Sequence, residues 1–325
     1  MTNSKAIRFM KIIVGLLVLM LLVVATFAYI TLKDITGDPL KVFGLGREDN
    51  INFLILGLDT DGAREAQNRG WRSDTMVIAS VDPLKNKITC ITLPRDTRTE
   101  VSRLDNNGNV TSTSLDKINH AFAYGHGRQK YSYQNSMNAV NNFMEVDGTK
   151  MPEITHYVGI DMDGFVKLAD MVGGVDLTLT DTMKGIGEKG QTVHLEGKKA
   201  EDFVRMRYGV TGGGDIGRGK RQQLFIRAFA KKLKDNDPIV NVPKIYKEAS
   251  DKKYVDTNLN DDQVAALAVA ISKIPNDEIE FVDIPGHNEK IKSLSFWIPD
   301  RDKLKQIIYD VFIDNTIDTI TSAEQ

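Results

Sequence analysis

The chain has 325 residues, and its 42 lysines and arginines are nearly balanced by 44 aspartates and glutamates, for a formal charge of −2. This balance excludes the overall basic surface of a nucleic-acid-binding protein, so a polyanion has to bind at a local cluster and no nucleic-acid partner is expected. Cys90 is the single cysteine, which excludes an intrachain disulfide and a cysteine-based zinc site. Because Cys90 lies in an apolar run, we interpret it as a small buried hydrophobe.

The first feature along the chain is a predicted membrane anchor. Residues 12–32 carry no charge, and the run is long enough to cross the hydrocarbon core of a bilayer as one helix. Cations precede the run, so the positive-inside rule predicts a cytoplasmic tail at residues 1–11 and an extracellular remainder. The alternative is a cleaved signal peptide, but its apolar region is usually shorter, and Ala25–Ala28 gives a poor cleavage site. We therefore expect a single-pass protein of the cell membrane.

Apolar strands follow a predicted linker at residues 33–48, which contains three glycines and a proline. The sequence predicts strands at Ile51–Leu58, Thr75–Val81, Lys87–Leu93 and, late in the chain, Ile279–Ile284. The first of these is a nearly continuous apolar run, which is typical of a central strand buried on both faces.

Apolar residues at helical spacing predict helices between and after these strands. The predicted helices lie around residues 137–144, 165–172, 224–229, 261–274 and 304–311. Gly173 and Gly174 are expected to end the second helix, and Asp300 to cap the last one. Interleaved strands and helices predict one α/β domain at residues 49–318: a three-layer αβα sandwich with a mixed central sheet, followed by a polar tail at 319–325.

Two carboxylates are predicted at the ends of neighbouring strands. Asp59 follows the first strand, and Asp74 precedes the second strand together with Arg72. The loops at strand ends are where open α/β sheets build their sites, and Mg²⁺ is usually held by one or two carboxylates plus substrate phosphates. Asp59 and Asp74 therefore form a candidate metal pair. The alternative is that each carboxylate caps a turn or a helix.

A second polar cluster, Arg95 and Asp96, follows the third apolar strand. An arginine at a strand end is well placed to bind phosphate oxygens. This motif alone favours the alternative, a purely structural Arg95–Asp96 pair.

The third cluster is the most basic stretch of the chain. Its cations are Arg205, Arg207, Arg218, Lys220 and Arg221, and among residues 205–223 only Asp215 opposes them. Arg205 and Arg207 would point the same way if this segment were a strand, and its many glycines would let backbone amides approach a ligand. The pattern indicates a polyanion-binding site, against the alternative of a solvent-exposed charged face. Residues 214–220 also match most of a nucleotide-binding P-loop, but Arg221 stands where Ser or Thr would hold Mg²⁺, so we reject that interpretation.

The histidines are weaker indicators. His120 is interpreted as a packed or supporting group beside a short helix. The chain has no HExxH and no GxSxG, so the usual signatures of zinc proteases and serine hydrolases are absent.

Taken together in this order, the motifs resemble the LytR-CpsA-Psr family. The matching segments are Asn52–Gly57 with Asp59-Thr60, Arg72–Thr75, Leu93–Thr97, Lys117–Ala121, Gly173–Val175, Phe203–Arg207, Gly214–Arg218 and Arg221–Gln223, with a weaker similarity at Ser295–Asp300. The chain departs from the pattern in the glycine-rich stretch Tyr208–Gly214, at the predicted lip of the site.

The resemblance implies one transmembrane helix, an outer α/β domain and a Mg²⁺-dependent phosphotransferase. Such an enzyme moves a glycopolymer with one phosphate from an undecaprenyl-pyrophosphate carrier to a muramic-acid hydroxyl of peptidoglycan, as for wall teichoic acid or capsule. It also implies that Asp59 and Asp74 hold Mg²⁺. The pyrophosphate oxygens would be bound by Arg72, Arg95, Arg205, Arg207, Arg218 and Gln222.

The general base stays open among Asp96, Asp215 and Asp74, with Arg95 also counted among the catalytic residues. Two other functions stay open as well. One is a pyrophosphatase acting on the same lipid-linked glycans, with water as the acceptor. The other is a lipid-binding regulator without catalysis.

Overall fold

The computed structural model describes residues 38–46, 49–59, 71–126, 130–206, 209–210 and 214–313, without the side chains of residues 59, 130, 214–216 and 276. Within these residues, no helix is both long and apolar enough to cross a membrane. The predicted anchor at 12–32 and both predicted tails, 1–11 and 319–325, lie outside the described residues.

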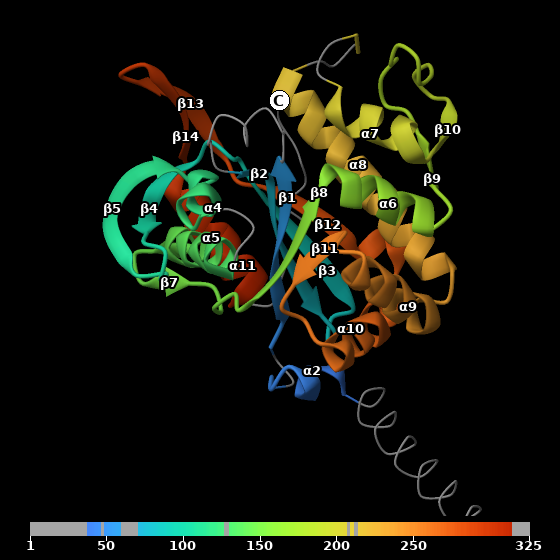
Figure 1. Cartoon of the computed structure of the whole chain (residues 1–325), viewed down its shortest axis with the longest axis horizontal. Coiled ribbons are helices and arrows are strands. Elements are labelled where there is room, and N and C mark those ends of the chain that lie inside the picture. Colours follow the sequence, from blue (N-terminus) through green and yellow to red (C-terminus); the bar gives the residue numbers. More distant parts are fainter. Residues whose placement is uncertain are drawn as a thin grey trace, which may run out of the picture.

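A six-stranded mixed sheet forms the centre of the fold (Figure 1). Its strands, in spatial order, are β11 (Val255–Thr257), β8 (His156–Asp161), β1 (Ile51–Asp59), β2 (Arg72–Asp82), β3 (Lys87–Leu93) and β12 (Ile279–Asp283). The β1–β8 and β3–β12 pairs are parallel, whereas the β1–β2, β2–β3 and β8–β11 pairs are antiparallel. The predicted mixed sheet is confirmed.

Helices cover both faces of this sheet, as the nearly continuous apolar sequence of β1 predicts. Leu54 and Leu56 point to one face and pack against α4 (His120–Tyr124), α5 (Lys130–Phe143) and α11 (Arg301–Phe312). Ile51 and Phe53 point to the other face and pack with the apolar side of α10 (Asp261–Lys273). The short helix α2 (Pro39–Val42) lies within the predicted linker, and its Leu40 is buried in this second core.

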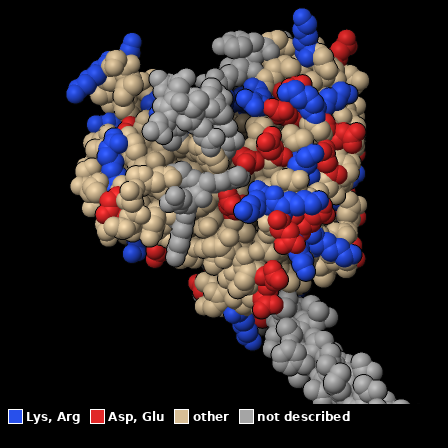
Figure 2. Space-filling model, viewed as in Figure 1, with Lys and Arg blue, Asp and Glu red and all other residues tan. Residues whose placement is uncertain are grey.

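A further group of elements builds its own apolar cluster on the right of Figure 1. These elements are α6 (Met162–Met171), β9 (Val175–Thr178), β10 (Thr192–Leu195), α7 (Gly197–Arg205), α8 (Gly214–Asp235) and α9 (Pro238–Asp251). Figure 2 shows acidic and basic side chains interspersed on this side, where Lys198 pairs with Glu201 and Asp202. Interspersed surface charge of this kind is well solvated and leaves binding to the hollows between elements.

Three hairpins and a short 3₁₀ turn, η1 (Asn276–Glu278), complete the described fold. The hairpins are β4 (Arg98–Leu104) with β5 (Val110–Lys117), β6 (Glu145–Val146) with β7 (Thr149–Lys150), and β13 (Gly286–Ile291) with β14 (Leu294–Pro299). The first and third hairpins meet at one loop, because Ile118 N donates to Thr97 O and Trp297 N donates to Asp96 O. That loop follows β3 and carries Arg95.

Several local predictions are confirmed. The Asp300 side chain accepts a hydrogen bond from Lys303 N and caps α11. Gly173 and Gly174 both have positive φ, 74° and 71°, which L-residues rarely adopt, and they follow the end of α6. Cys90 is buried among apolar side chains, and this burial raises the pKa of its thiol to about 12.

Two local predictions are wrong. Strand β2 begins at Arg72 rather than Thr75, because β1 and β2 pair as far as Asp59 and Arg72. Residues 214–219 belong to α8 rather than to a loop. Each helical glycine costs about 1 kcal/mol relative to alanine, but the tertiary packing of a long helix overrides such a cost.

Candidate phosphate-binding site

The site forms where the polar ends of three strands meet. Strands β1 and β2 are antiparallel, so the last residue of β1 lies beside the first residue of β2. Met76 of β2 pairs with Leu93 of β3, so the chain leaving β3 passes close to Asp74. The register alone therefore gathers Asp59, Arg72, Asp74 and Arg95 at one edge of the sheet.

Asp74 and Arg95 form the best-defined pair of this edge. Arg95 Nη1 donates to Asp74 Oδ2 at 2.7 Å, and each side chain is about a quarter exposed. The pair joins β2 to the loop after β3, and it holds both charges at the surface of a hollow. Charge-assisted hydrogen bonds of this length are stronger than neutral ones and fix orientation.

Asp96 has a different main partner from the one that the sequence suggested. Its Oδ1 accepts from Lys117 Nζ at 2.7 Å, whereas Arg95 Nε lies 4.0 Å from its other oxygen. Lys117 ends β5, so this ion pair connects the hairpin to the loop. The expected Arg95–Asp96 structural pair is the weaker contact, and Lys117 received no role from sequence.

A hollow of about 500 Å³ opens beside Asp74. Its polar lining comes from Asp74, Thr75, Asp161, Arg205, Arg218 and Gln222. Its apolar lining comes from Ile55, Leu56, Leu58, Ile160, Met162, Phe165, Val204 and Ile226, with Gly57. A cavity lined by both arginines and apolar side chains matches an amphipathic ligand that carries an anionic head.

Arg218 and Gln222 enter this hollow from α8. They are four residues apart, so they lie on one face of the helix. The Gln222 amide oxygen accepts from Thr75 Oγ1 at 3.3 Å, and its nitrogen donates to Val204 O at 3.5 Å. Gln222 thus connects α8 to both β2 and α7.

Arg205 is the last residue of α7, and it lines the hollow. Because Arg205 is helical, the expectation that Arg205 and Arg207 point the same way, which required a strand, does not apply. Its Nη1 lies 3.0 Å from Glu201 Oε1, one turn earlier in the same helix, and the side chain is 57% exposed. Exposed pairs within one helix contribute only a few tenths of a kcal/mol, so this side chain is readily available to an incoming anion.

The predicted site residues thus divide into four groups. Asp74, Arg205, Arg218 and Gln222 line the hollow, and Arg95 and Asp96 are attached to it through the contacts above. Arg72 begins β2, and its charge acts on His120. Arg207 and the side chains of Asp59 and Asp215 lie outside the described residues.

His120 lies in a polar network next to this edge. Its Nδ1 is 3.0 Å from Asp116 Oδ1, and Tyr124 donates to the other carboxylate oxygen at 2.6 Å. Burial lowers the pKa of His120 below its ordinary value, and the Asp116 carboxylate acts in the opposite direction. These contacts agree with the interpretation of His120 as a packed, supporting group.

Sequence reasoning missed the residues from β8 and α6. Asp161 follows an apolar strand, as Asp59 does, and this shared pattern was the available signal. Its Oδ1 caps α6 by accepting from Gly164 N at 2.7 Å, and the residue lines the hollow. The apolar wall gave no signal, because residues facing a cavity and residues facing a core have the same hydropathy.

The described residues fit a magnesium ion only in part. They contain no group of three or more His, Cys, Asp or Glu side chains arranged for a metal. Asp74 lines the hollow with its carboxylate, and one or two protein carboxylates plus substrate phosphates and water are the usual Mg²⁺ ligands. Asp74 therefore fits the protein's share of such a site.

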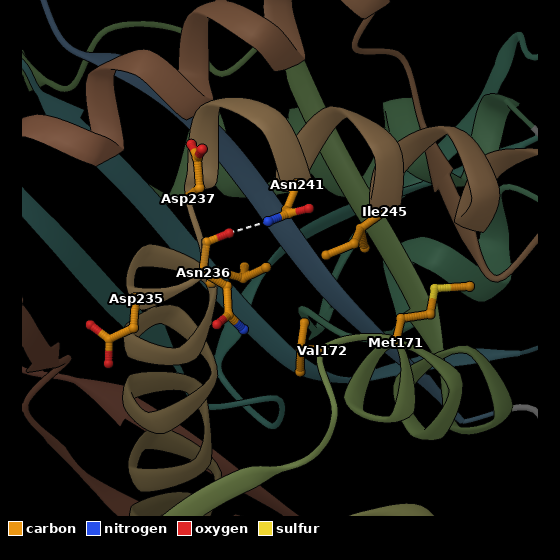
Figure 3. Close-up of a pocket in the computed structure, with 8 residues that line it drawn as sticks. Met171, Val172, Asp235, Asn236, Asp237, Asn241 and Ile245 are labelled. Carbon is orange, nitrogen blue, oxygen red and sulfur yellow. Dashed lines mark hydrogen bonds between the residues drawn. The ribbon is translucent and has the colours of Figure 1, made fainter.

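A second hollow, of about 450 Å³, lies where α8 meets α9 next to the end of α6 (Figure 3). It is lined by Met171, Val172, Leu233, Asp235, Asn236, Asp237, Asn241 and Ile245. Asn241 Nδ2 donates to Asn236 O across its rim. Since carboxylates but no lysine or arginine are among these lining residues, this hollow does not suit an anion.

Comparison with known proteins places this geometry in a family. The model of the LytR_cpsA_psr family matches residues 23–312. The polyisoprenyl-teichoic acid–peptidoglycan teichoic acid transferase TagU of Halalkalibacterium halodurans is 27% identical over 320 residues, which cover 94% of this chain and 96% of that protein.

Solved structures share the fold. The crystal structure of B. subtilis TagV has a TM-score of 0.62 and 25% identity, covering 83% of this chain and 99% of that chain. A structure of TagT bound to LIIa-WTA has a TM-score of 0.60 over 82% of this chain and 90% of that chain; at 18% identity this likeness shows the fold alone. With the family model spanning most of its length, the chain belongs to the LytR_cpsA_psr family.

Proposed function

We propose that this protein is a phosphotransferase that moves a glycopolymer, with one phosphate, from a polyprenyl-pyrophosphate carrier to a muramic-acid hydroxyl of peptidoglycan. The observation that carries the proposal is the hollow beside Asp74, whose lining combines two arginines, Arg205 and Arg218, with eight apolar side chains. A lipid pyrophosphate combines these two properties. The names of the relatives support a glycopolymer transferase, because TagU is named for transfer from polyisoprenyl-linked teichoic acid to peptidoglycan.

The arginines that line the hollow bind the pyrophosphate. Arg205 and Arg218 approach from α7 and α8, and they neutralise charge that shifts to the leaving phosphate as the bond breaks. Gln222 orients the oxygens, and Arg95, Arg72 and Arg207 are assigned to the same head group. Asp74, together with Asp59, would hold Mg²⁺. The bound ion would supply electrostatic stabilisation of the phosphoryl oxygens.

The bond changes follow from this placement. The acceptor hydroxyl oxygen attacks the glycan-bearing phosphorus, the bond from that phosphorus to the bridging oxygen breaks, and the carrier leaves as its monophosphate. The hydroxyl proton passes to a carboxylate. Asp96 and Asp215 remain the candidates, with Asp74 a third if metal binding does not occupy it fully. Asp96 lies beside Arg95, whose Nε is 4.0 Å from one carboxylate oxygen, and its other oxygen accepts from Lys117 Nζ at 2.7 Å.

The apolar wall takes the prenyl chain. Ile55, Ile160, Phe165 and Ile226 are among the apolar side chains that line the hollow together with the arginines. Each buried CH₂ contributes about 0.8 kcal/mol, so a few isoprene units supply most of the donor's affinity. The proposed anchor at residues 12–32 would keep this wall near the bilayer that holds the carrier, with the domain outside the cell. Wall teichoic acid, capsule and related polymers all meet these requirements.

A transfer assay tests the proposal. The full chain is supplied with Mg²⁺, a polyprenyl-pyrophosphate-linked glycan and peptidoglycan fragments, and the covalent product is measured. Asp74→Ala should abolish transfer, whereas Asp176→Ala, which removes an exposed carboxylate of β9, should not. Steady release of phosphoglycan at a rate that does not depend on added peptidoglycan would indicate a pyrophosphatase instead of a transferase. Donor binding without any turnover would leave a lipid-binding regulator.

A further inference from the structure

Arg221 is the least expected buried residue of the molecule. It is 1% exposed and leads the fully buried side chains in volume. It lies on α8 between Arg218 and Gln222, yet it packs on the side of the apolar cluster that contains Phe203, Val204 and Phe225. Burial lowers the pKa of its guanidinium, and the charge of Asp181 acts in the opposite direction. Burying a cation costs free energy unless the cation is paired or hydrogen-bonded.

The contact that Arg221 makes is to the end of α7. Its Nη2 donates to Met206 O, the carbonyl of the residue that caps α7. Among the described residues, its Nε and Nη1 have no hydrogen-bond partner. The last carbonyls of a helix lack partners within the helix, and a cation there satisfies them and complements the helix dipole.

The next residue of α8 makes a parallel contact. Gln222 Nε2 donates to Val204 O at 3.5 Å. Two consecutive side chains of α8 therefore bind the carbonyls on either side of Arg205, and we call these two hydrogen bonds the α7–α8 contact. The two helices lie next to each other in Figure 1.

The chain that follows is held from the opposite side. Lys184 N donates to Gly209 O at 3.1 Å, and Met183 forms a β-bridge with Val210. The backbone at the end of α7 is thus fixed at residue 206 by Arg221 and at residues 209–210 by the Met183 loop. Within the described part of the chain, the Arg205 side chain is paired with Glu201 in an exposed contact of its own helix, so its position depends on its backbone.

We propose that Arg221 is a positioning residue of the candidate phosphate site: its buried guanidinium fixes the C-terminal end of α7 and thereby holds Arg205 at the hollow that Arg218 also lines. This inference rests on the proposed function, since it assigns Arg205 to the donor's pyrophosphate. Arginine suits the task because its planar group donates at a fixed angle while its stem packs with apolar side chains, whereas lysine is a flexible point donor.

A double-mutant cycle on the full chain tests the inference, with the KM and kcat for a polyprenyl-pyrophosphate-linked glycan as readouts. Arg221→Lys should raise the donor KM about tenfold with a smaller change in kcat, as Arg205→Ala should. The double variant should be no worse than Arg205→Ala alone, because both changes remove the same interaction. Arg221→Lys combined with Arg95→Ala should instead multiply the two single effects.

A separate variant controls for a loss of stability. Leu177→Ala, in the same apolar cluster but away from the hollow, should lower the melting temperature and leave the donor KM unchanged. Should Arg221→Lys fail to fold, Arg221→Gln keeps a side-chain donor and serves in the same cycle.

The outcomes distinguish a failure of the role assigned to Arg221 from a failure of the proposed function. If Arg205→Ala raises the donor KM while Arg221→Lys does not, or if their effects multiply, Arg221 is only a packing residue and the inference is overturned, with the proposed function intact. If the unchanged protein neither binds nor turns over the lipid-linked donor with Mg²⁺, the proposed function fails, and the assignment of Arg221 fails with it.

Discussion

The two sides of the phosphate site are built differently. On the side of β4–β5, the charges are paired between elements: Asp74 with Arg95 at 2.7 Å and Asp96 with Lys117 at 2.7 Å. On the side of α7, Arg205 is paired within its own helix and is 57% exposed. Pairs that connect separate elements fix geometry, whereas a pair within one helical turn is easily exchanged for a ligand. We infer that the first side orients the reacting groups and that the second side receives the donor.

The largest effect is expected where the two sides meet, at Asp74. Asp74→Asn keeps the size of the side chain but removes the charge that binds Arg95 and the proposed metal. The transfer rate should fall about a hundredfold or more, because electrostatic stabilisation of the transition state is lost. Single-turnover transfer measures this directly. A variant that retains most of its activity would remove Asp74 from the chemistry.

The apolar wall should affect affinity rather than rate. Phe165→Ala removes a ring that lines the hollow and packs against Phe225. Loss of about 2 kcal/mol of apolar contact should weaken binding of a long-chain polyprenyl phosphate about thirtyfold. Binding of a short-chain, water-soluble analogue should hardly change. Equal losses for both ligands would mean that the prenyl chain binds elsewhere; Leu177→Ala serves as the stability control.

Arginines on the two sides should respond differently. Arg205→Ala should raise the donor KM about tenfold with little change in melting temperature, because its ion pair is exposed. Arg95→Ala should lower both kcat and the free energy of unfolding, the latter by about 1 kcal/mol, because Asp74 loses a partner from another element. Kinetics and thermal melts of both variants test this contrast. If both variants change kcat, KM and melting temperature in the same way, the distinction between the two sides is wrong.

The smallest effect concerns pH and the His120 network. Burial lowers the pKa of His120 in the folded protein, so the unfolded chain binds a proton more readily. The contribution of neutral His120 to the free energy of unfolding is therefore fully present above the ordinary histidine pKa of about 6.5, and it is lost as the pH falls below that value. His120→Gln should flatten the decline in melting temperature between about pH 7 and pH 5. His287→Gln, which changes an exposed histidine, should leave the decline unchanged.

The sequence predicted the side of the site that depends on strand ends. Asp74 and Arg95 directly adjoin apolar strands, and strand periodicity is a strong signal, so their convergence followed from adjacent strands. The register between β1 and β2 could not be predicted from the sequence. The predicted start of β2, Thr75, is therefore three residues later than the observed start, Arg72.

The other side depends on helix packing, which leaves little trace in local sequence. Arg205 ends a helix instead of lying on a strand, and Gly214–Gly219 are helical despite their composition. Lys117 received no role from sequence, because only the tertiary structure pairs it with Asp96. Arg221 was counted with the cations of the polyanion-binding cluster, but the tertiary structure buries it. The apolar wall was equally hidden, since hydropathy does not distinguish a cavity lining from a core.

The most direct test is a crystal structure of the protein with a polyprenyl pyrophosphate and Mg²⁺. We predict that the head group lies against Asp74, Arg205 and Arg218, with the ion on Asp74 and the first isoprene units along Phe165 and Ile226. A lipid bound elsewhere, or a head group without contact to Arg205 and Arg218, would contradict the assignment of this hollow to the donor.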